Sequence, residues 1–179
     1  MTTRTRYGRR TEKRVLEILH SGKVNYWTGP VGMEFERAFA KAFGFRNAVS
    51  VLSGFAACRV AYLALGLDPD GDENHSIVRL PLAPHPSHHS HRSLKVAYFT
   101  FGVGQPITAG GQGGMVCTDD DELAWEMRSI RDHGYDARRR MSAESKTANP
   151  YVHRRLGYNF RLTEIQSAIG LGELERLEL

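Results

Sequence analysis

The sequence predicts an α/β domain, and the order of its apolar segments is the reason. A short β-branched run at 48–52 leads through Ser53-Gly54 directly into an Ala- and Leu-rich stretch at 55–67. Strand, small-residue turn and helix in this order make half of an α/β unit. The N-terminus of such a helix exposes backbone N–H groups that favour a phosphate. Two further strands and another helix are expected at 96–101, 115–118 and 119–131.

Two helices are expected before the first strand. Residues 11–20 place apolar side chains on one face, and Gly22 stands where this helix would end. In 31–43, phenylalanines recur at i, i+4 and i+8, which predicts a stripe buried in the core. Pro30 suits the first turn of this second helix, and Gly44 suits its end. The stripe consists of Phe35, Phe39 and Phe43.

A last helix is expected after Leu162. Thr163, followed three residues later by Gln166, matches a capping box, in which side chains and backbone N–H groups satisfy one another. The apolar side chains that follow can share one buried face of this helix. The expected buried residues are Ile165, Ile169, Leu174 and Leu177.

Composition and charge are those of an ordinary soluble globular protein. The chain has 179 residues, 41% of them hydrophobic and 25% charged, which suffices for one domain with its own core. It contains no apolar run of membrane-spanning length and no apolar segment after its basic N-terminus, so we expect neither a membrane span nor a secretory signal. The only cysteines, Cys58 and Cys117, indicate free thiols in the cytoplasm. The net charge of +4 is concentrated near the N-terminus, which we interpret as a solvated face and not as a nucleic-acid site.

Residues 74–95 separate two parts of the chain. The segment is rich in proline and histidine and has neither strand alternation nor a helical period. We therefore expect a disordered linker between an N-terminal part at 1–73 and the remainder of the domain at 96–179. No metal site is expected, because the histidines are not accompanied by the cysteine or acidic ligands that would complete one. These histidines are His85, His88, His89 and His91.

Three segments carry distinctive motifs in a fixed order. The first, 26–73, contains Tyr-Trp-Thr-Gly-Pro, Phe-Glu-Arg-Ala-Phe-Ala and Ser-Gly-Phe-Ala-Ala. The second, 98–134, contains Phe-Thr-Phe, Ile-Thr-Ala-Gly-Gly-Gln-Gly-Gly-Met-Val and Arg-Asp-His-Gly. The third, 151–177, contains Leu-Gly-Tyr-Asn-Phe-Arg-Leu-Thr-Glu-Ile-Gln and is the most specific of the three. Together they resemble the DegT/StrS family of nucleotide-sugar aminotransferases, which depend on pyridoxal phosphate (PLP).

The resemblance implies an aspartate-aminotransferase-like domain (PLP fold type I) with three layers around a mainly parallel sheet, normally in a homodimer. The domain is expected to be incomplete. Residues 74–95 stand where the family has several strands and the aspartate that contacts the pyridine nitrogen, and the chain ends at Leu179, before the family's C-terminal domain. The implied reaction moves an amino group from a donor such as glutamate, through PLP, onto a keto-sugar nucleotide.

The resemblance also implies contacts to the PLP phosphate. Gly54, Phe55 and Ala56 match the family's phosphate-binding turn, with Phe55 in place of a threonine. Thr100 matches a phosphate-binding serine. Asn159 matches an asparagine that reaches the phosphate across the dimer interface. These five residues are the expected cofactor contacts.

Gln105 occupies the position of the lysine that holds PLP as a Schiff base in the family. A primary amide forms no imine and transfers no proton at neutral pH, so no catalytic residue is assigned. Lys95 precedes the strand and would need a different geometry. Three interpretations remain open. The chain is a catalytically impaired family member (a decayed gene or a mis-assembled reading frame included), a pseudoenzyme that pairs with and regulates a full-length aminotransferase, or a working transaminase that uses another lysine, its own or a partner's.

Overall fold

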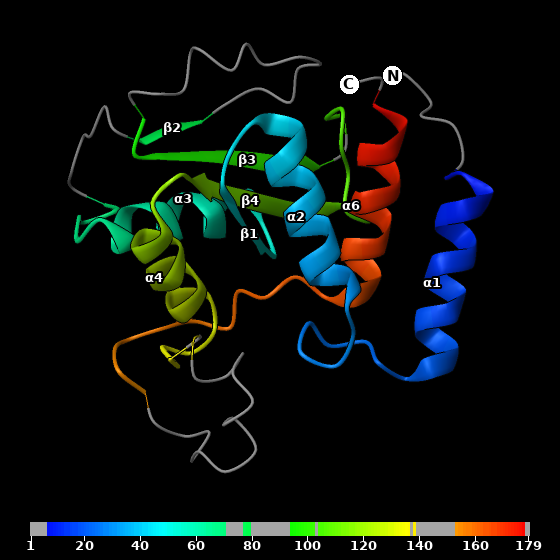
Figure 1. Ribbon diagram of the computed structural model, residues 1–179, viewed down its shortest axis with the longest axis horizontal. Coiled ribbons are helices and arrows are strands. Elements are labelled where there is room, and N and C mark those ends of the chain that lie inside the picture. The colour runs from blue at the N-terminus through cyan, green and yellow to red at the C-terminus, as the bar shows by residue number, and fades with distance from the viewer. Residues whose placement is uncertain are drawn as a thin grey trace.

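A four-stranded sheet lies between two layers of helices in the computed structural model (Figure 1). The structure describes residues 7–70, 77–79, 94–102, 104–136, 138 and 153–177. Helices α2 (Val31–Phe43) and α6 (Glu164–Arg176) cover one face of the sheet, and α1 (Arg9–Ser21) packs on α6. Helices α3 (Gly54–Ala64) and α4 (Asp121–Arg131) cover the other face. The α/β class and the three layers expected from the sequence are confirmed.

The strands are β1 (Asn47–Val51), β2 (Ile77–Arg79), β3 (Val96–Gly102) and β4 (Gln112–Thr118), in the spatial order β1-β4-β3-β2. Both partners of β4 run antiparallel to it, and only β2 and β3 are parallel. The expected mainly parallel pairing is thus corrected for the described strands. The connection between β3 and β4 spans 103–111, which is too short for the crossover that parallel neighbours need, so the chain turns back antiparallel.

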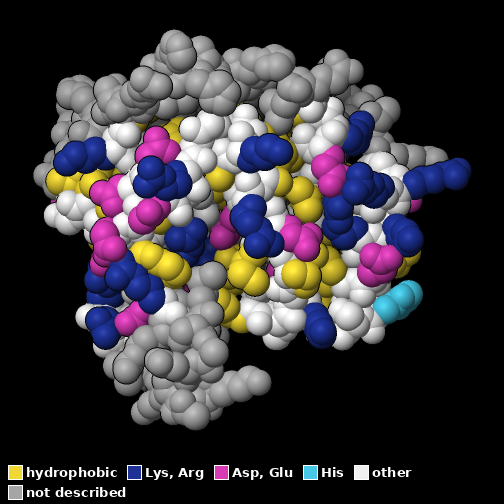
Figure 2. Space-filling view, viewed as in Figure 1, with side chains coloured by type: hydrophobic (Ala, Val, Ile, Leu, Met, Phe, Trp, Pro, Cys, Tyr) yellow, Lys and Arg dark blue, Asp and Glu magenta, His cyan; other side chains and the backbone are white. Residues whose placement is uncertain are grey.

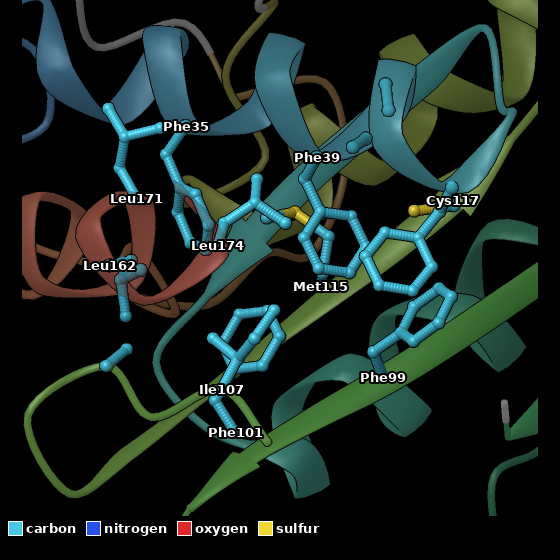
Figure 3. Packing of buried hydrophobic residues seen from close by; sticks show 14 of the residues in the cluster. Phe35, Phe39, Phe99, Phe101, Ile107, Met115, Cys117, Leu162, Leu171 and Leu174 are labelled. Atoms are coloured by element: carbon cyan, nitrogen blue, oxygen red, sulfur yellow. The ribbon is translucent and has the colours of Figure 1, made fainter. Parts of the chain in front are cut away.

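The larger core lies between the sheet and α2. Side chains along β3 alternate between the two faces, so that Phe99 and Phe101 point toward α2 while Tyr98 points toward α3. The predicted stripe of α2 meets this row, as Figure 3 shows. The Phe39 ring centroid lies 5.0 Å from that of Phe99 and 4.3 Å from that of Phe43. The prediction of a buried aromatic stripe is therefore confirmed.

Local signals placed the helix ends well. Helix α2 has the predicted bounds, although Pro30 is its N-cap and does not lie in its first turn. Gly22 and Gly44 follow α1 and α2 with φ of 68° and 72°, the left-handed conformation that glycine adopts without steric cost. The capping box of α6 is present as predicted, with Thr163 and Gln166 bonded reciprocally.

The buried face of α6 differs from the expected stripe, of which only Leu174 is buried; the other three are partly exposed. The helix lies between α1 and α2 (Figure 1) and approaches both through small residues. A Cβ on Gly170 would lie 2.7 Å from Phe35 of α2, and one on Gly172 would lie 2.0 Å from Thr11 of α1. Helix α6 therefore packs closely against α1 and α2 through its glycines and does not bury a single apolar stripe.

One part of the segment 74–95 is a strand. Ile77–Arg79 form β2, which pairs with β3 from Val96 to Tyr98. The expectation that this segment contains no strand is wrong at these three residues, because backbone pairing with β3 compensates for a weak side-chain pattern. The four histidines at 85–91 lie outside the described residues, so the linker and the absence of a metal site stay predictions.

Charges of both signs are mixed over the surface. Figure 2 shows Lys and Arg side chains interspersed with Asp and Glu over the face in view. Several are paired, as Arg14 is with Glu175 at 3.1 Å. Among the described residues, no helix is both long enough and apolar enough for a membrane crossing.

Candidate functional site

A cavity of about 600 Å³ opens where the start of α3 meets the end of β3. It brings together four residues that the sequence singled out, although they lie up to 51 positions apart: Gly54, Phe55, Thr100 and Gln105. The remaining lining residues are Ser53, Cys58, Tyr98, Phe101, Gly102 and Gln112. This cavity is therefore the candidate site.

The start of α3 forms one wall of the cavity. Ser53 is the N-cap, and its Oγ accepts a hydrogen bond from the Ala56 N–H at 3.1 Å. Ala56 is itself buried and does not line the cavity. Of the three predicted turn residues, only Gly54 and Phe55 therefore belong to the site. The N–H groups of the first two helical residues have no acceptor within the helix. Together with the helix dipole they favour a negatively charged group at this end.

Gly54 and Thr100 are in direct contact. A Cβ built on Gly54 would lie 2.4 Å from Cγ2 of Thr100, closer than any real contact. The absence of a side chain at Gly54 thus lets β3 approach the helix start, so that Thr100 lines the cavity.

Phe55 contributes an aromatic ring to the lining of the cavity. Its side chain is 69% exposed, which is unusual for a residue of this size. The Arg59 guanidinium lies 5.9 Å from the ring centroid. The position therefore contributes a flat apolar surface beside the free helix N–H groups, and no hydrogen-bonding side chain.

Gln105 follows β3 in a turn, and its N–H donates to the Gly102 carbonyl at 3.1 Å. Its neutral amide belongs to a lining without a charged side chain. Lys95 lies at the other end of β3, in a separate depression that it shares with Arg46 and Asp119. The seven residues of β3 span roughly 20 Å, which is beyond the reach of a lysine side chain. Of the described lysines, none lines the cavity.

Asn159 lies apart from this cavity. It is exposed, and its backbone forms an isolated bridge with Asp132. The carbonyl of the next residue, Phe160, accepts the Leu52 N–H at 2.9 Å, so this segment pairs with the residue that follows β1. Within one copy of the chain the structure does not bring Asn159 to the other predicted contacts.

Sequence reasoning missed several lining residues that a simple pattern could have found. Tyr98 lies two residues before Thr100 and therefore on the same face of β3. Cys58 lies four residues after Gly54 and therefore on the same face of α3. Gln112 faces them from the first position of β4 and has no comparable local signal.

The motif residues outside the cavity form buried polar contacts. Glu36 Oε1 accepts hydrogen bonds from the N–H and the hydroxyl of Ser50, at 2.9 and 2.8 Å, and from Arg131. Tyr26 donates to Glu36 Oε2 at 2.9 Å, and burial raises the pKa of its hydroxyl, which keeps this proton in place. The Arg131 guanidinium carbon also lies 4.1 Å from the Tyr26 ring centroid. These contacts tie α2 and α4 to the strand that leads into Ser53.

Glu164 links the third motif to the first. Its carboxylate accepts the N–H groups of Val31 and Gly32, both at 2.7 Å, and so caps α2 from a different helix. A Cβ on Gly29 would lie 2.2 Å from Glu164 Oε2, so this glycine keeps the space that the cap needs. The Asp132 carboxylate likewise accepts Trp27 Nε1 at 2.8 Å. The most distinctive motif residues therefore build the scaffold of the site and do not line it.

The sequence is similar to that of known aminotransferases. The model of the DegT/DnrJ/EryC1/StrS aminotransferase family matches residues 6–74 and 89–179. The GDP-perosamine synthase of Caulobacter vibrioides is 43% identical over 82 residues, which cover 46% of this chain and 19% of that protein. The chain thus matches about a fifth of the length of this curated relative.

Solved structures share the fold. An aminotransferase from Psychrobacter cryohalolentis has a TM-score of 0.76 at 20% identity, covering 96% of this chain and 62% of that one. NtdA from Bacillus subtilis, solved with its cofactor pyridoxamine phosphate (PMP) bound, has a TM-score of 0.71 at 18% identity, covering 96% and 54%. Because the family model spans most of the sequence, the resemblance carried by its three motifs is confirmed, and this chain belongs to the DegT/DnrJ/EryC1/StrS aminotransferase family.

Proposed function

We propose that this chain is a catalytically impaired member of the family, which does not by itself transfer an amino group from glutamate to a keto-sugar nucleotide. The observation that carries the proposal is Gln105, which lies in the candidate site with Gly54 and Thr100, where no described lysine is present. Amino transfer through PLP needs a side chain that forms a Schiff base and moves protons. An amide does neither.

The lining suits one end of PLP, the cofactor that the family implies. The phosphate end fits: the α3 N-terminus supplies N–H groups and Thr100 a hydroxyl. The lining offers no covalent partner for an aldehyde, because it has the Gln105 amide and carries no amine. The described residues therefore suit a phosphate but offer the cofactor no covalent attachment.

The test is covalent trapping. The purified chain is incubated with PLP, treated with borohydride, and mapped by mass spectrometry. We expect no stoichiometric label on any lysine peptide of the native chain. Gln105→Lys is the matched gain-of-function variant, because it places an amine at the mouth of the cavity, and it should acquire label at residue 105. Stoichiometric label on a lysine of the native chain would contradict the proposal.

A second function is favoured by one observation. Asn159 is exposed in the single chain and lies apart from the cavity, as a residue that serves a neighbouring subunit would. The alternative is a non-catalytic pseudoenzyme that binds or regulates a full-length aminotransferase. Light scattering with size-exclusion chromatography of the chain, alone and mixed with a full-length family member, tests it. A monomer in both samples counts against this alternative.

A cytoplasmic location is part of the proposal. Both cysteines, Cys58 and Cys117, are free thiols, which suits a reducing compartment.

A further inference from the structure

The lining of the candidate cavity is polar and aromatic but carries no charge. None of the ten lining residues carries a charged side chain at neutral pH. Hydroxyl and amide groups come from Thr100, Tyr98, Gln105 and Gln112, and the exposed ring comes from Phe55. A site with a lysine here would instead carry a positive charge beside its ligand. The described lining therefore places no charge beside a ligand.

Each part of the lining selects one part of a ligand. The start of α3 favours a phosphate. The rings of Phe55 and Tyr98 offer flat surfaces to a planar heteroaromatic ring. The Gln105 amide both donates and accepts hydrogen bonds, so it suits an alcohol, an aldehyde or an amine substituent on that ring.

The absence of a lysine charge from the cavity affects the binding of amines in particular. A lysine ammonium would repel a protonated amine on the ligand, as like charges do at short range. A glutamine removes that repulsion, and it also removes the covalent advantage that a lysine gives to an aldehyde. Both effects reduce the difference in binding affinity between the aldehyde form and the amine form of one ligand.

We propose that the cavity is a non-covalent site for phosphorylated pyridine rings, which binds the amine form (PMP) and the alcohol form (pyridoxine phosphate) as tightly as PLP. Gln105 is the residue that sets this tolerance. The inference rests on the proposed function, since covalent capture of PLP would restore a preference for the aldehyde.

The experiment is equilibrium dialysis of the full chain against PLP, PMP and pyridoxine phosphate, with inorganic phosphate as competitor. We expect the three dissociation constants to agree within about threefold. Thr100→Val keeps the methyl that contacts Gly54 but removes the hydroxyl, and it should weaken all three ligands by about fivefold. Lys95→Gln alters the separate depression at the other end of β3 and should leave all three unchanged.

Gln105→Lys supplies the converse result. It should bind PLP at least about tenfold more tightly than PMP, because its amine adds to the aldehyde, water leaves, and borohydride reduces the resulting C=N bond. Circular dichroism spectra that match the native chain show that each variant is folded.

Two outcomes overturn the inference in different ways. If the native chain binds PLP more than about tenfold more tightly than PMP and borohydride labels a lysine, the proposed function fails as well. If none of the three ligands binds, or if Thr100→Val changes nothing while binding persists, only the inference fails, and the absence of lysine labelling leaves the proposed function standing.

Discussion

Arg131 and Glu36 form an ion pair inside the protein, with 2.5 Å between Nη1 of the arginine and Oε1 of the glutamate. The arginine side chain is entirely shielded from solvent. The same two residues bind the backbone of Ser50: its N–H donates to Glu36, and its carbonyl accepts from Arg131 at 3.2 Å. Among the described strands β1 pairs only with β4, and the ion pair satisfies the backbone N–H and carbonyl of Ser50, which would otherwise be buried without partners.

Removing one partner of this pair should destabilise the fold strongly. Arg131→Met leaves the Glu36 carboxylate buried without its counter-charge, and we expect a loss of about 3–5 kcal/mol in the free energy of unfolding. Urea denaturation followed by circular dichroism measures it. Arg46→Met is the control, because its ion pair with Asp121 is exposed and should be worth less than about 1 kcal/mol. Equal effects of the two substitutions would refute this account.

The α2 cap from Glu164 predicts a pH dependence. Burial raises the pKa of this carboxyl above its ordinary value, against the lowering effect of the Gly32 and Val31 N–H groups. The native state then holds the proton more tightly than the unfolded state does, so this residue's contribution to stability is full below the unfolded pKa and is lost as the pH rises through the folded value. Glu164→Gln should abolish this component of the pH profile.

Unfolding free energies measured from about pH 4 to pH 7 for the native chain and Glu164→Gln test this prediction. The difference between the two profiles should change across the window just above the ordinary glutamate pKa. The substitution should also lower stability by about 1–3 kcal/mol, because the amide replaces one of the two acceptor oxygens with an NH2 group, which cannot accept the N–H that faces it. A constant difference across the window would show that Glu164 does not titrate there.

Close packing of α6 predicts that Gly170→Ala is destabilising. The added methyl would lie 2.7 Å from the Phe35 ring, which is itself fully buried. We expect a cost of about 1–3 kcal/mol, typical of overpacking, seen as a lower midpoint in thermal denaturation. Gly8→Ala is the matched control, since nothing lies within 4 Å of its added methyl. A Gly170→Ala midpoint equal to that of the control would argue against close helix contact.

The contact between Trp27 and Asp132 gives a spectroscopic prediction. The indole N–H donates to the carboxylate at 2.8 Å, and Asp132 is buried. Trp27→Phe should cost about 1–3 kcal/mol, because it leaves one carboxylate oxygen without this donor. The remaining fluorescence comes from Trp125, so the unfolding transition can still be followed by emission. An unchanged transition midpoint in urea would contradict the prediction.

Local sequence patterns accounted for most of the elements. The bounds of α2, the glycines that end α1 and α2, and the capping box of α6 depend on residues within one or two turns of each other. The same holds for the strand–turn–helix unit around Ser53. Such features are visible in sequence because the interactions that set them are local.

Long-range contacts were not predictable in this way. Glu36 and Arg131 are separated by 95 positions, and Val31 and Glu164 by 133. A buried polar side chain reveals nothing in sequence about which distant group satisfies it. The strand order and the strand directions likewise depended on pairing in space, as did the glycine face of α6.

The candidate site depends both on local sequence motifs and on long-range packing. The motifs alone were enough to identify the family, and they predict that Gln105 occupies the position of the family's lysine. The folded chain was needed to show that Gly54, Thr100 and Gln105 share one uncharged cavity, that Ala56 is buried, and that Lys95 lies at the far end of β3. The type of each side chain follows from the sequence, whereas its neighbours, burial and reach depend on how the sheet and helices pack.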